Sequence, residues 1–289
     1  MEASATSVLL EGLSCDRLTR VVDVGANPLT PPPYAELLAM AGCEVWGFEP
    51  QPDAFEELQR TKSDLETYFP YAVGDGREMT LHLYRESGLT SVFEPYEGAF
   101  SYLGRSRRNM ETLQDISFET KTLDQIEDLG AFDVLKIDIQ GGEVMVFEGA
   151  QEKLKAATAV IPEIRYYPLY QGEPMFGGVD VELRRQGFVL HKLMFEKAKV
   201  IPNSQIERIK RAKMRNQVID GDAVYIRDLG QVDRYTDAQL MHLAVAASAI
   251  FESHDLVLFC LDRLVERKAA PGDLPGAYVD ALPRQLRKS

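Results

Sequence analysis

The sequence contains little cysteine, few positive charges and no long apolar run. Only three cysteines occur in 289 residues, Cys15, Cys43 and Cys260, and their spacing fits no metal-binding motif. An odd number of unclustered cysteines is typical of a protein from a reducing compartment. The net charge of −13 argues against general binding to nucleic acid or to an anionic membrane. Because 45% of the residues are hydrophobic, the chain can still build a substantial core.

Targeting and membrane signals are also missing. The first twenty residues have no basic start, and their apolar run covers only residues 8–10, which is not the pattern of a signal peptide. The longest helical apolar run, Leu243–Phe251, is far too short to span a bilayer. We therefore expect a cytoplasmic protein with no membrane span and no nucleic-acid partner.

Two short apolar strands that each stop at an acid are the most informative feature present. Residues 18–27 read LTRVVDVGAN, so that Gly25 follows Asp23 closely, and residues 43–52 read CEVWGFEPQP, so that the strand ends at Glu49. A glycine lets the backbone approach a ligand closely. An acid after the next strand of an open α/β sheet is placed to bind the two hydroxyls of a ribose. Together the two strand ends predict a pocket for a nucleoside-bearing cofactor.

Strand and helix patterns alternate from about residue 18 to residue 228. Most predicted strands are continuous apolar runs, and such alternation predicts a mostly parallel, doubly wound α/β sheet. Two insertions interrupt it, a β-hairpin at about 79–121 and a lid-like segment at about 195–222. The predicted strands are 20–24, 44–48, 66–73, 132–137, 159–164, 187–192 and 223–227, and the predicted helices are 33–41, 53–62, 142–155 and 175–186.

The alternation stops near residue 230. Residues 1–230 are therefore predicted to form the main domain, and residues 231–289 a helical extension. Thr236 and Gln239 have the spacing of a capping box, and Ser253 is placed to cap a second helix. The apolar faces of this helical hairpin, Thr236–Glu266, are wide. We expect them either to form a homodimer or to dock within the chain.

An ordered set of motifs narrows the interpretation. The motifs are DVGAN (Asp23–Asn27), FEPQPDAFEEL (Phe48–Leu58), AVGDG (Ala72–Gly76), LTSV (Leu89–Val92), TLDQI (Thr122–Ile126) and LKIDIQGGE (Leu135–Glu143). In this order they resemble the FkbM family of S-adenosylmethionine-dependent methyltransferases over roughly residues 21–227. The resemblance implies a Rossmann-like, seven-stranded class I methyltransferase sheet with an antiparallel last strand, S-adenosylmethionine as cofactor, and methyl transfer to a hydroxyl oxygen.

On such a fold the cofactor residues meet at the carboxyl ends of the strands. Three of the acids have ordinary structural alternatives: Asp23 as a helix cap, Glu49 as a solvated strand end and Asp75 as a turn residue. The methionine part is expected at Asp23, Gly25 and Asn27, and the ribose at Glu49 with Pro50 beside it. The adenine is expected at Ala72, Val73 and Asp75, and the sulfonium at Asp138.

Methyl transfer to an alcohol benefits from a base that accepts the hydroxyl proton. The candidates are His191 near the end of the sixth strand, Glu163 at the end of the fifth, and Asp138. His191 is slightly preferred because the reference pKa of histidine suits neutral pH. The alternatives are a structural role for His191 and an ion pair between Glu163 and Arg165. No metal site is predicted.

The acceptor is predicted to be a small molecule or glycan, either a sugar or a secondary metabolite. The segment Arg208–Arg215 carries five basic residues. It would favour an anionic acceptor if it covers the cleft, whereas a solvated helix face is the default interpretation of such a run.

Two other functions remain open. A nicotinamide-dependent oxidoreductase usually carries G-x-G-x-x-G, but here Gly25 is followed by Ala26, Asn27, Pro28 and Leu29. The second alternative is a non-catalytic protein that binds a partner through its helical tail and retains a vestigial cofactor pocket.

Overall fold

The computed structural model describes residues 4–103 and 106–288, and its centre is a seven-stranded sheet in the order β3-β2-β1-β7-β8-β10-β9. Neighbouring strands are parallel except at β10, which is antiparallel to both β8 and β9. The predicted doubly wound sheet with an antiparallel last strand is therefore confirmed. The strands are β1 (Thr19–Val24), β2 (Cys43–Phe48), β3 (Glu66–Phe69), β7 (Val134–Ile137), β8 (Ala159–Arg165), β9 (Phe188–Lys199) and β10 (Gln217–Arg227).

Helices cover both faces of this sheet. Neighbouring residues of β1 point into different cores: Val21 packs with α1, α2 and the C-terminal helices, whereas Val22 packs with α5 and α6. A strand buried on both faces has no polar side, which explains the continuous apolar runs of the sequence. These helices, together with α3 beside β3, are α1 (Ala5–Gly12), α2 (Ala35–Ala39), α3 (Pro52–Thr61), α5 (Glu143–Glu148) and α6 (Phe176–Arg185).

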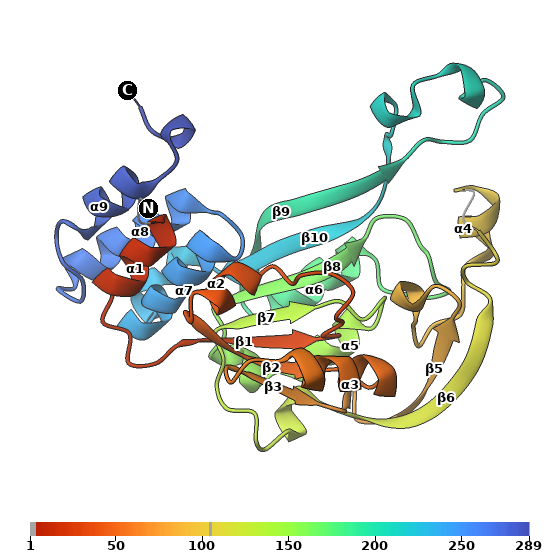
Figure 1. Ribbon diagram of the computed structural model, residues 1–289, viewed down its shortest axis with the longest axis horizontal. Coiled ribbons are helices and arrows are strands. Elements are labelled where there is room, and N and C mark those ends of the chain that lie inside the picture. The colour runs from red at the N-terminus through yellow and green to blue at the C-terminus, as the bar shows by residue number, and fades with distance from the viewer. Residues whose placement is uncertain (1–3, 104–105, 289) are drawn as a thin grey trace.

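A second sheet of three strands, in the order β4-β6-β5, lies beyond the carboxyl ends of the large sheet's parallel strands (Figure 1). Its strands β5 (Glu78–Tyr84) and β6 (Thr112–Lys121) pair antiparallel, as predicted, with the short helix α4 (Glu97–Ser101) between them in the chain. The predicted strand 66–73 is split, because β3 ends in the large sheet and β4 (Ala72–Val73) joins the small one. Pro70 stands between them, and a proline cannot donate a hydrogen bond to a strand ladder.

The two strands on either side of the predicted lid extend beyond the apolar runs from which they were predicted. β9 was expected to end at residue 192 and β10 to begin at residue 223, but they continue to Lys199 and from Gln217 as a long antiparallel hairpin. Three register shifts interrupt their pairing, and such bulges break the simple alternation by which a strand is recognised. The segment Arg208–Arg215 lies at the tip of this hairpin, which extends beyond the sheet (Figure 1).

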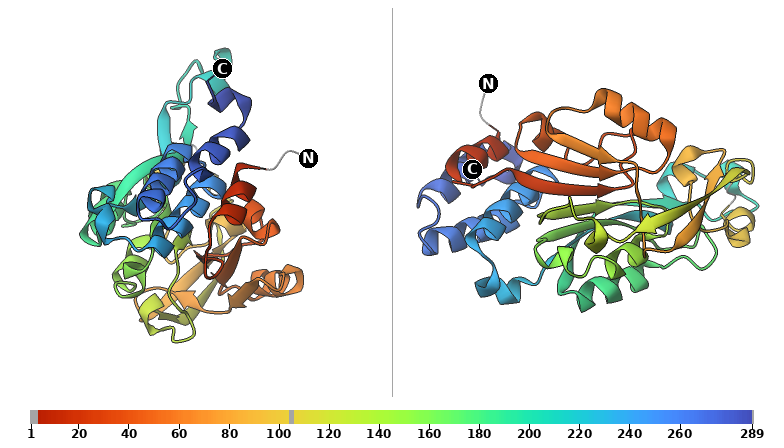
Figure 2. Two further views of the ribbon diagram at one scale, coloured as in Figure 1. Left: turned by 90° about the vertical axis from the view of Figure 1, so that its left-hand side faces the viewer. Right: turned by 90° about the horizontal axis from the view of Figure 1, so that it is seen from below.

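Up to residue 288, the C-terminal extension contains three α-helices, α7 (Asp237–Ala249), α8 (His254–Glu266) and α9 (Leu274–Ala281). With α1 they gather where the parallel strands begin, at the end opposite the small sheet (Figures 1 and 2). The predicted capping box of Thr236 and Gln239 is confirmed. Residues 240–248 of α7 are all buried, and α8 and α9 share their core with α1 and the sheet.

The apolar faces that suggested a homodimer are thus covered within one chain, so they no longer require a second copy. None of the helices in the described ranges combines the length and the apolar character needed to cross a bilayer.

Candidate active site

A cavity of about 550 Å³ opens at the carboxyl ends of β1, β2 and β7 and is closed on its other side by the small sheet. The position follows the general rule for open α/β sheets, and the volume lies within the roughly 300–1,000 Å³ of small-molecule sites. The structure brings most of the predicted cofactor residues together here. Those that line the cavity are Asp23, Gly25, Asn27, Glu49, Pro50, Ala72, Val73 and Asp138.

Gly25 allows the ends of β1 and β7 to approach each other. Its φ of +83° is a conformation that side chains disfavour, and a Cβ there would lie 2.1 Å from the carbonyl oxygen of Asp138. The glycine therefore fixes the floor of the cavity through a backbone contact, in addition to any contact with a ligand.

Glu49 is a buried carboxylate that faces the cavity. Its Oε1 accepts a hydrogen bond from the backbone N–H of Gln51 at 2.8 Å, the one donor to this side chain within the described ranges. Only 3% of the residue is exposed, and burial raises the pKa of Glu49 to about 7. A carboxylate removed from water with a single donor can accept further hydrogen bonds from a ligand.

Asp23 has partners inside the protein. Its Oδ2 accepts a hydrogen bond from the Tyr34 hydroxyl at 2.6 Å, and its Oδ1 lies 3.1 Å from the Lys136 Nζ. Burial alone would lower the pKa of Lys136, but the carboxylates of Asp23 and Asp138 raise it above its ordinary value. Asp23 therefore holds the loop after β1 and the cation of β7 in place while it lines the cavity.

Two other predicted cofactor residues have local roles. The Asn27 Oδ1 accepts a hydrogen bond from the Leu29 N–H at 3.0 Å, so Asn27 shapes the loop as well as lining the cavity. Asp75 pairs with Arg77 and is not among the described lining residues. The turn role that the sequence left open for Asp75 is therefore the one the structure displays.

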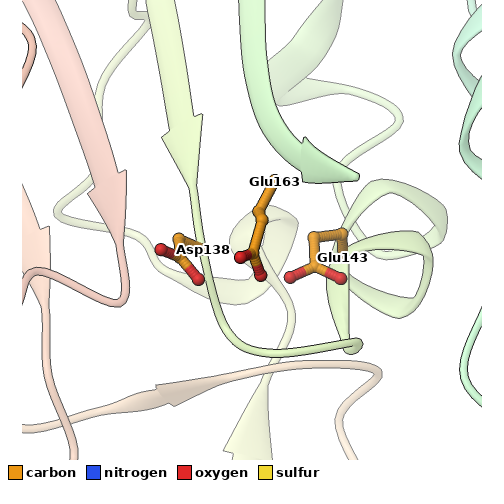
Figure 3. A group of neighbouring side chains, drawn as sticks. All are labelled: Asp138, Glu143 and Glu163. Atoms are coloured by element: carbon orange, nitrogen blue, oxygen red, sulfur yellow. The ribbon is translucent and has the colours of Figure 1, made fainter. Parts of the chain in front are cut away.

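Three carboxyl groups meet beside the cavity, from the ends of β7 and β8 and from α5 (Figure 3). The carboxyl groups of Asp138 and Glu143 lie on either side of that of Glu163, and oxygens of all three lie within 4.8 Å of one another. The spacing would suit a cation, but donors of the chain itself already contact these oxygens. Glu143 accepts from the N–H groups of Ile139 and Gly141, at 3.1 and 3.3 Å.

Gln140 joins the other two carboxylates. Its Nε2 donates to the Asp138 Oδ1 at 2.8 Å and to the Glu163 Oε2 at 2.9 Å, and its Oε1 accepts from the Arg165 Nη2 at 2.7 Å. The backbone φ of Gln140 is +57°, which turns the residue into the cluster. The Ser91 hydroxyl donates to the Gln140 carbonyl at 2.7 Å and ties the loop after β5 to the site.

Arg165 supplies the positive charge behind these groups. Its guanidinium lies 2.8 Å from Glu163 and 3.3 Å from both Glu173 and Asp220, and only 4% of its side chain is exposed. The ion pair with Glu163 is the alternative that the sequence left open. Even so, burial and the neighbouring Asp138 raise the pKa of Glu163 well above its ordinary value.

Other acids of the site are shifted in the same direction. Burial raises the pKa of Glu143 to about 7. Burial and the charge of Asp138 raise the pKa of Asp222, which lines the cavity, to about 6. Burial thus favours the protonated form of several carboxyl groups at the site, and carboxyl groups shifted in this way are common where catalysis transfers protons.

The structure does not bring His191 to the cavity, which corrects the expectation that it is the preferred base. Its Nε2 lies 2.6 Å from the Ser253 hydroxyl, its ring packs edge-on against Phe251, and burial lowers its pKa. The sequence placed His191 near the end of a strand that was expected to stop at Lys192. Because β9 continues to Lys199, His191 lies near its beginning, at the edge of the sheet covered by the C-terminal helices.

The sequence did not identify several residues of the site, among them Lys136, Asp222, Tyr34 and Glu143. Lys136 and Asp222 could have been predicted, because each is a charged residue inside an otherwise apolar strand and a buried charge needs a partner. Tyr34 gave no signal of its own. Glu143 belongs to the motif LKIDIQGGE, but no role in the site was predicted for it.

The basic segment Arg208–Arg215 does not line the cavity in any of its described residues. Arg211 pairs with Glu207, and Arg208 donates to the Gln205 Oε1 at 2.9 Å, so part of its charge is held within the tip of the hairpin.

Comparison with solved structures gives distant similarities. They include the magnesium protoporphyrin IX methyltransferase of Synechocystis PCC 6803 with bound SAM (12% identity, 77% of this chain and 76% of that chain, TM-score 0.39). A putative S-adenosylmethionine-dependent methyltransferase from Listeria monocytogenes is similar at 11% identity over 78% of this chain and 98% of that chain, with a TM-score of 0.38. Similarities this distant do not indicate what this chain binds. A search of curated proteins gave no match.

A family match is more extensive. The sequence profile of the methyltransferase FkbM domain matches residues 23–190, from the end of β1 to the beginning of β9. This range is more than half of the chain and contains the predicted cofactor residues and the carboxylate cluster. The seven-stranded sheet with its single antiparallel strand is that of the class I methyltransferases. The chain therefore belongs to the FkbM methyltransferase family.

Proposed function

We propose that the protein is an S-adenosylmethionine-dependent O-methyltransferase that methylates a hydroxyl group of a sugar, a glycan or a secondary metabolite. The observation that carries the proposal is Glu49, a buried carboxylate at the end of β2 that faces the cavity with one protein donor. Ribose hydroxyls are the donors that such a carboxylate binds in open α/β sheets.

The chemistry of the cavity fits this cofactor. When bound, S-adenosylmethionine supplies a methyl group on a cationic sulfur. The carboxylate of Asp138 lines the cavity at the end of β7 and would favour a nearby positive charge. Ala72 and Val73 give an apolar surface next to Glu49, where the flat base of a nucleoside can lie.

The carboxylates of Asp138 and Glu163 supply a place for the proton of the acceptor. Asp138 faces the cavity, Glu163 lies behind it, and the single amide of Gln140 bridges the two. Burial and the charge of Asp138 raise the pKa of Glu163 well above its ordinary value, so Glu163 is a second proton acceptor beside the cavity. In the proposed reaction Asp138 would accept the proton of the acceptor hydroxyl, and the bound cofactor would supply the methyl group to that oxygen and leave as S-adenosylhomocysteine.

The first test compares cofactors. We expect isothermal titration to show binding of S-adenosylhomocysteine and none of NAD. Glu49→Gln should weaken the binding of S-adenosylhomocysteine by about 5- to 150-fold, because hydrogen bonds to a charged group contribute roughly 1–3 kcal/mol. Glu44→Gln, at the other end of β2 and paired with Arg20, is the matched control and should bind normally. Binding of NAD alone would favour the oxidoreductase instead.

A second expected result is a pH dependence that belongs to Glu49. Since the pKa of Glu49 is about 7 in the free protein, the carboxylate is largely protonated at pH 5.5 and largely ionised at pH 8. A protonated acid accepts fewer hydrogen bonds from a ribose, so affinity for S-adenosylhomocysteine should rise across this range. Glu49→Gln should flatten this rise. An equal rise in the variant would assign the titration to another group.

A further inference from the structure

The wall of the cavity is acidic. Its described lining contains the four carboxylates Asp23, Glu49, Asp138 and Asp222, and Lys136 is the only cation. Lys136 is already paired with Asp23, and it also lies 3.4 Å from the Gly25 carbonyl oxygen. A phosphate or carboxylate brought by the acceptor would find no unpaired cation there and would meet like charges at low dielectric.

The side of the cavity formed by the small sheet is largely apolar, with Thr120 of β6 as a polar member of the described lining. Met79 and Leu81 share one face of β5, and Phe118 of β6 pairs directly with Met79, so the three side chains form one surface. All three line the cavity. We call these three side chains the ribbon surface. It lies opposite the strand ends that hold the predicted cofactor residues.

Two further apolar side chains of the lining are exposed to solvent and so form part of the rim of the cavity. Leu29, in the loop after β1, is 62% exposed, and Phe195 of β9 is 51% exposed, and both line the cavity. Phe195 is in register with Asp222, which is in register with Glu163. Phe195 therefore lies close to the carboxylates near which the acceptor hydroxyl would react.

We propose that the methyl acceptor is an uncharged alcohol with an apolar, ring-containing body, held between the ribbon surface (Met79, Leu81 and Phe118) and the rim residues Leu29 and Phe195. This inference rests on the proposed function and chooses within it. The acidic wall disfavours anionic acceptors, and the apolar surfaces disfavour a free sugar, whose hydroxyls would lose water without gaining partners. The acidic wall and the apolar surfaces thus both favour an uncharged, largely apolar acceptor.

The test uses a matched pair of probes, 2-naphthylmethanol and 6-(hydroxymethyl)-2-naphthoate, which differ in one carboxylate, together with methyl β-D-glucopyranoside. Each is titrated calorimetrically into the full-length protein saturated with S-adenosylhomocysteine. We expect 2-naphthylmethanol to bind and both other probes to bind at least about 10-fold more weakly. Phe195→Ala and Leu29→Ala should each weaken the binding of 2-naphthylmethanol by about 10-fold, the effect of losing most of one apolar side-chain contact.

The rim variants are exposed substitutions and should leave the binding of S-adenosylhomocysteine and the melting temperature unchanged. Leu113→Ala, on β6 and also exposed but outside the cavity lining, is the matched control and should bind all probes as the wild type does. Equal or tighter binding of the naphthoate or the glucoside overturns the inference. So does an absence of 2-naphthylmethanol binding at millimolar concentration when S-adenosylhomocysteine binds. Failure of S-adenosylhomocysteine itself to bind would instead overturn the proposed function.

Discussion

Replacing Asp138 with asparagine is expected to lower kcat for methyl transfer to an alcohol by about 10²–10⁴-fold, the usual contribution of a positioned base. Asp138 is the member of the carboxylate cluster that lines the cavity. Asparagine has nearly the same shape and can still accept the hydrogen bond that Gln140 donates, so the loss would be of the base and not of the fold. Release of S-adenosylhomocysteine gives the rate, and calorimetry gives the cofactor affinity.

The affinity for S-adenosylhomocysteine should change little in this variant, because that molecule carries no sulfonium charge. Asp75→Asn is the matched control: the same substitution at an acid that pairs with Arg77 outside the cavity lining should keep normal turnover. If Asp138→Asn also turns over normally, positioning of the acceptor alone accounts for the rate. That result would remove the proposed base.

Glu163→Gln tests whether Glu163 takes part in the proton transfer. Glutamine removes its titrating group and can still accept from Arg165. Since the pKa of Glu163 is raised well above its ordinary value, we expect the acidic limb of the kcat profile to lose the contribution of Glu163 and to move to lower pH. A purely structural role for Glu163 would lower kcat without moving this limb.

The order of strands and helices could be predicted because each strand buried on both faces gives a continuous apolar run. The predicted strand bounds were wrong where the sequence signal for the end of a strand was weak or was not used. Pro70 divides one predicted strand between two sheets, and bulges conceal the outer halves of β9 and β10. The second of these errors led to the misplacement of His191, since the position of a residue along a strand determines which edge of the sheet it reaches.

Residues at strand ends could be placed from the sequence, but their partners could not. Glu49 and Asp138 follow apolar runs and were expected at the cavity, where the structure has them. The contact of Gly25 with the Asp138 backbone and the bridging role of Gln140 depend on how β1, β7 and β8 lie side by side. Spacing within one segment carries no information about such contacts between segments.

The second large effect is expected for stability. Arg165→Met should lower the free energy of unfolding by about 3–5 kcal/mol near pH 8, because it leaves the buried carboxylates of Glu163 and Glu173 without their cation. The guanidinium contacts Glu163, Glu173 and Asp220, and its side chain is almost completely buried. Urea unfolding followed by circular dichroism measures the difference. Arg184→Met is the matched control: Arg184 pairs with Asp180 at 2.7 Å but is 55% exposed, and such pairs contribute about 0–1 kcal/mol.

The deficit of Arg165→Met should shrink as the pH falls. Burial already raises the pKa values of Glu163 and Glu173 above their ordinary values when Arg165 is present, and removing the cation must raise both further. An acid whose folded-state pKa exceeds its unfolded value favours the folded state at low pH, and this contribution is lost as the pH rises through the folded-state pKa. The variant should therefore approach the wild type near pH 5 and differ most from it near pH 8. A deficit that is the same at both values would mean that Arg165 acts by packing, for instance over the Tyr170 ring at 5.9 Å, and not by neutralising the carboxylates.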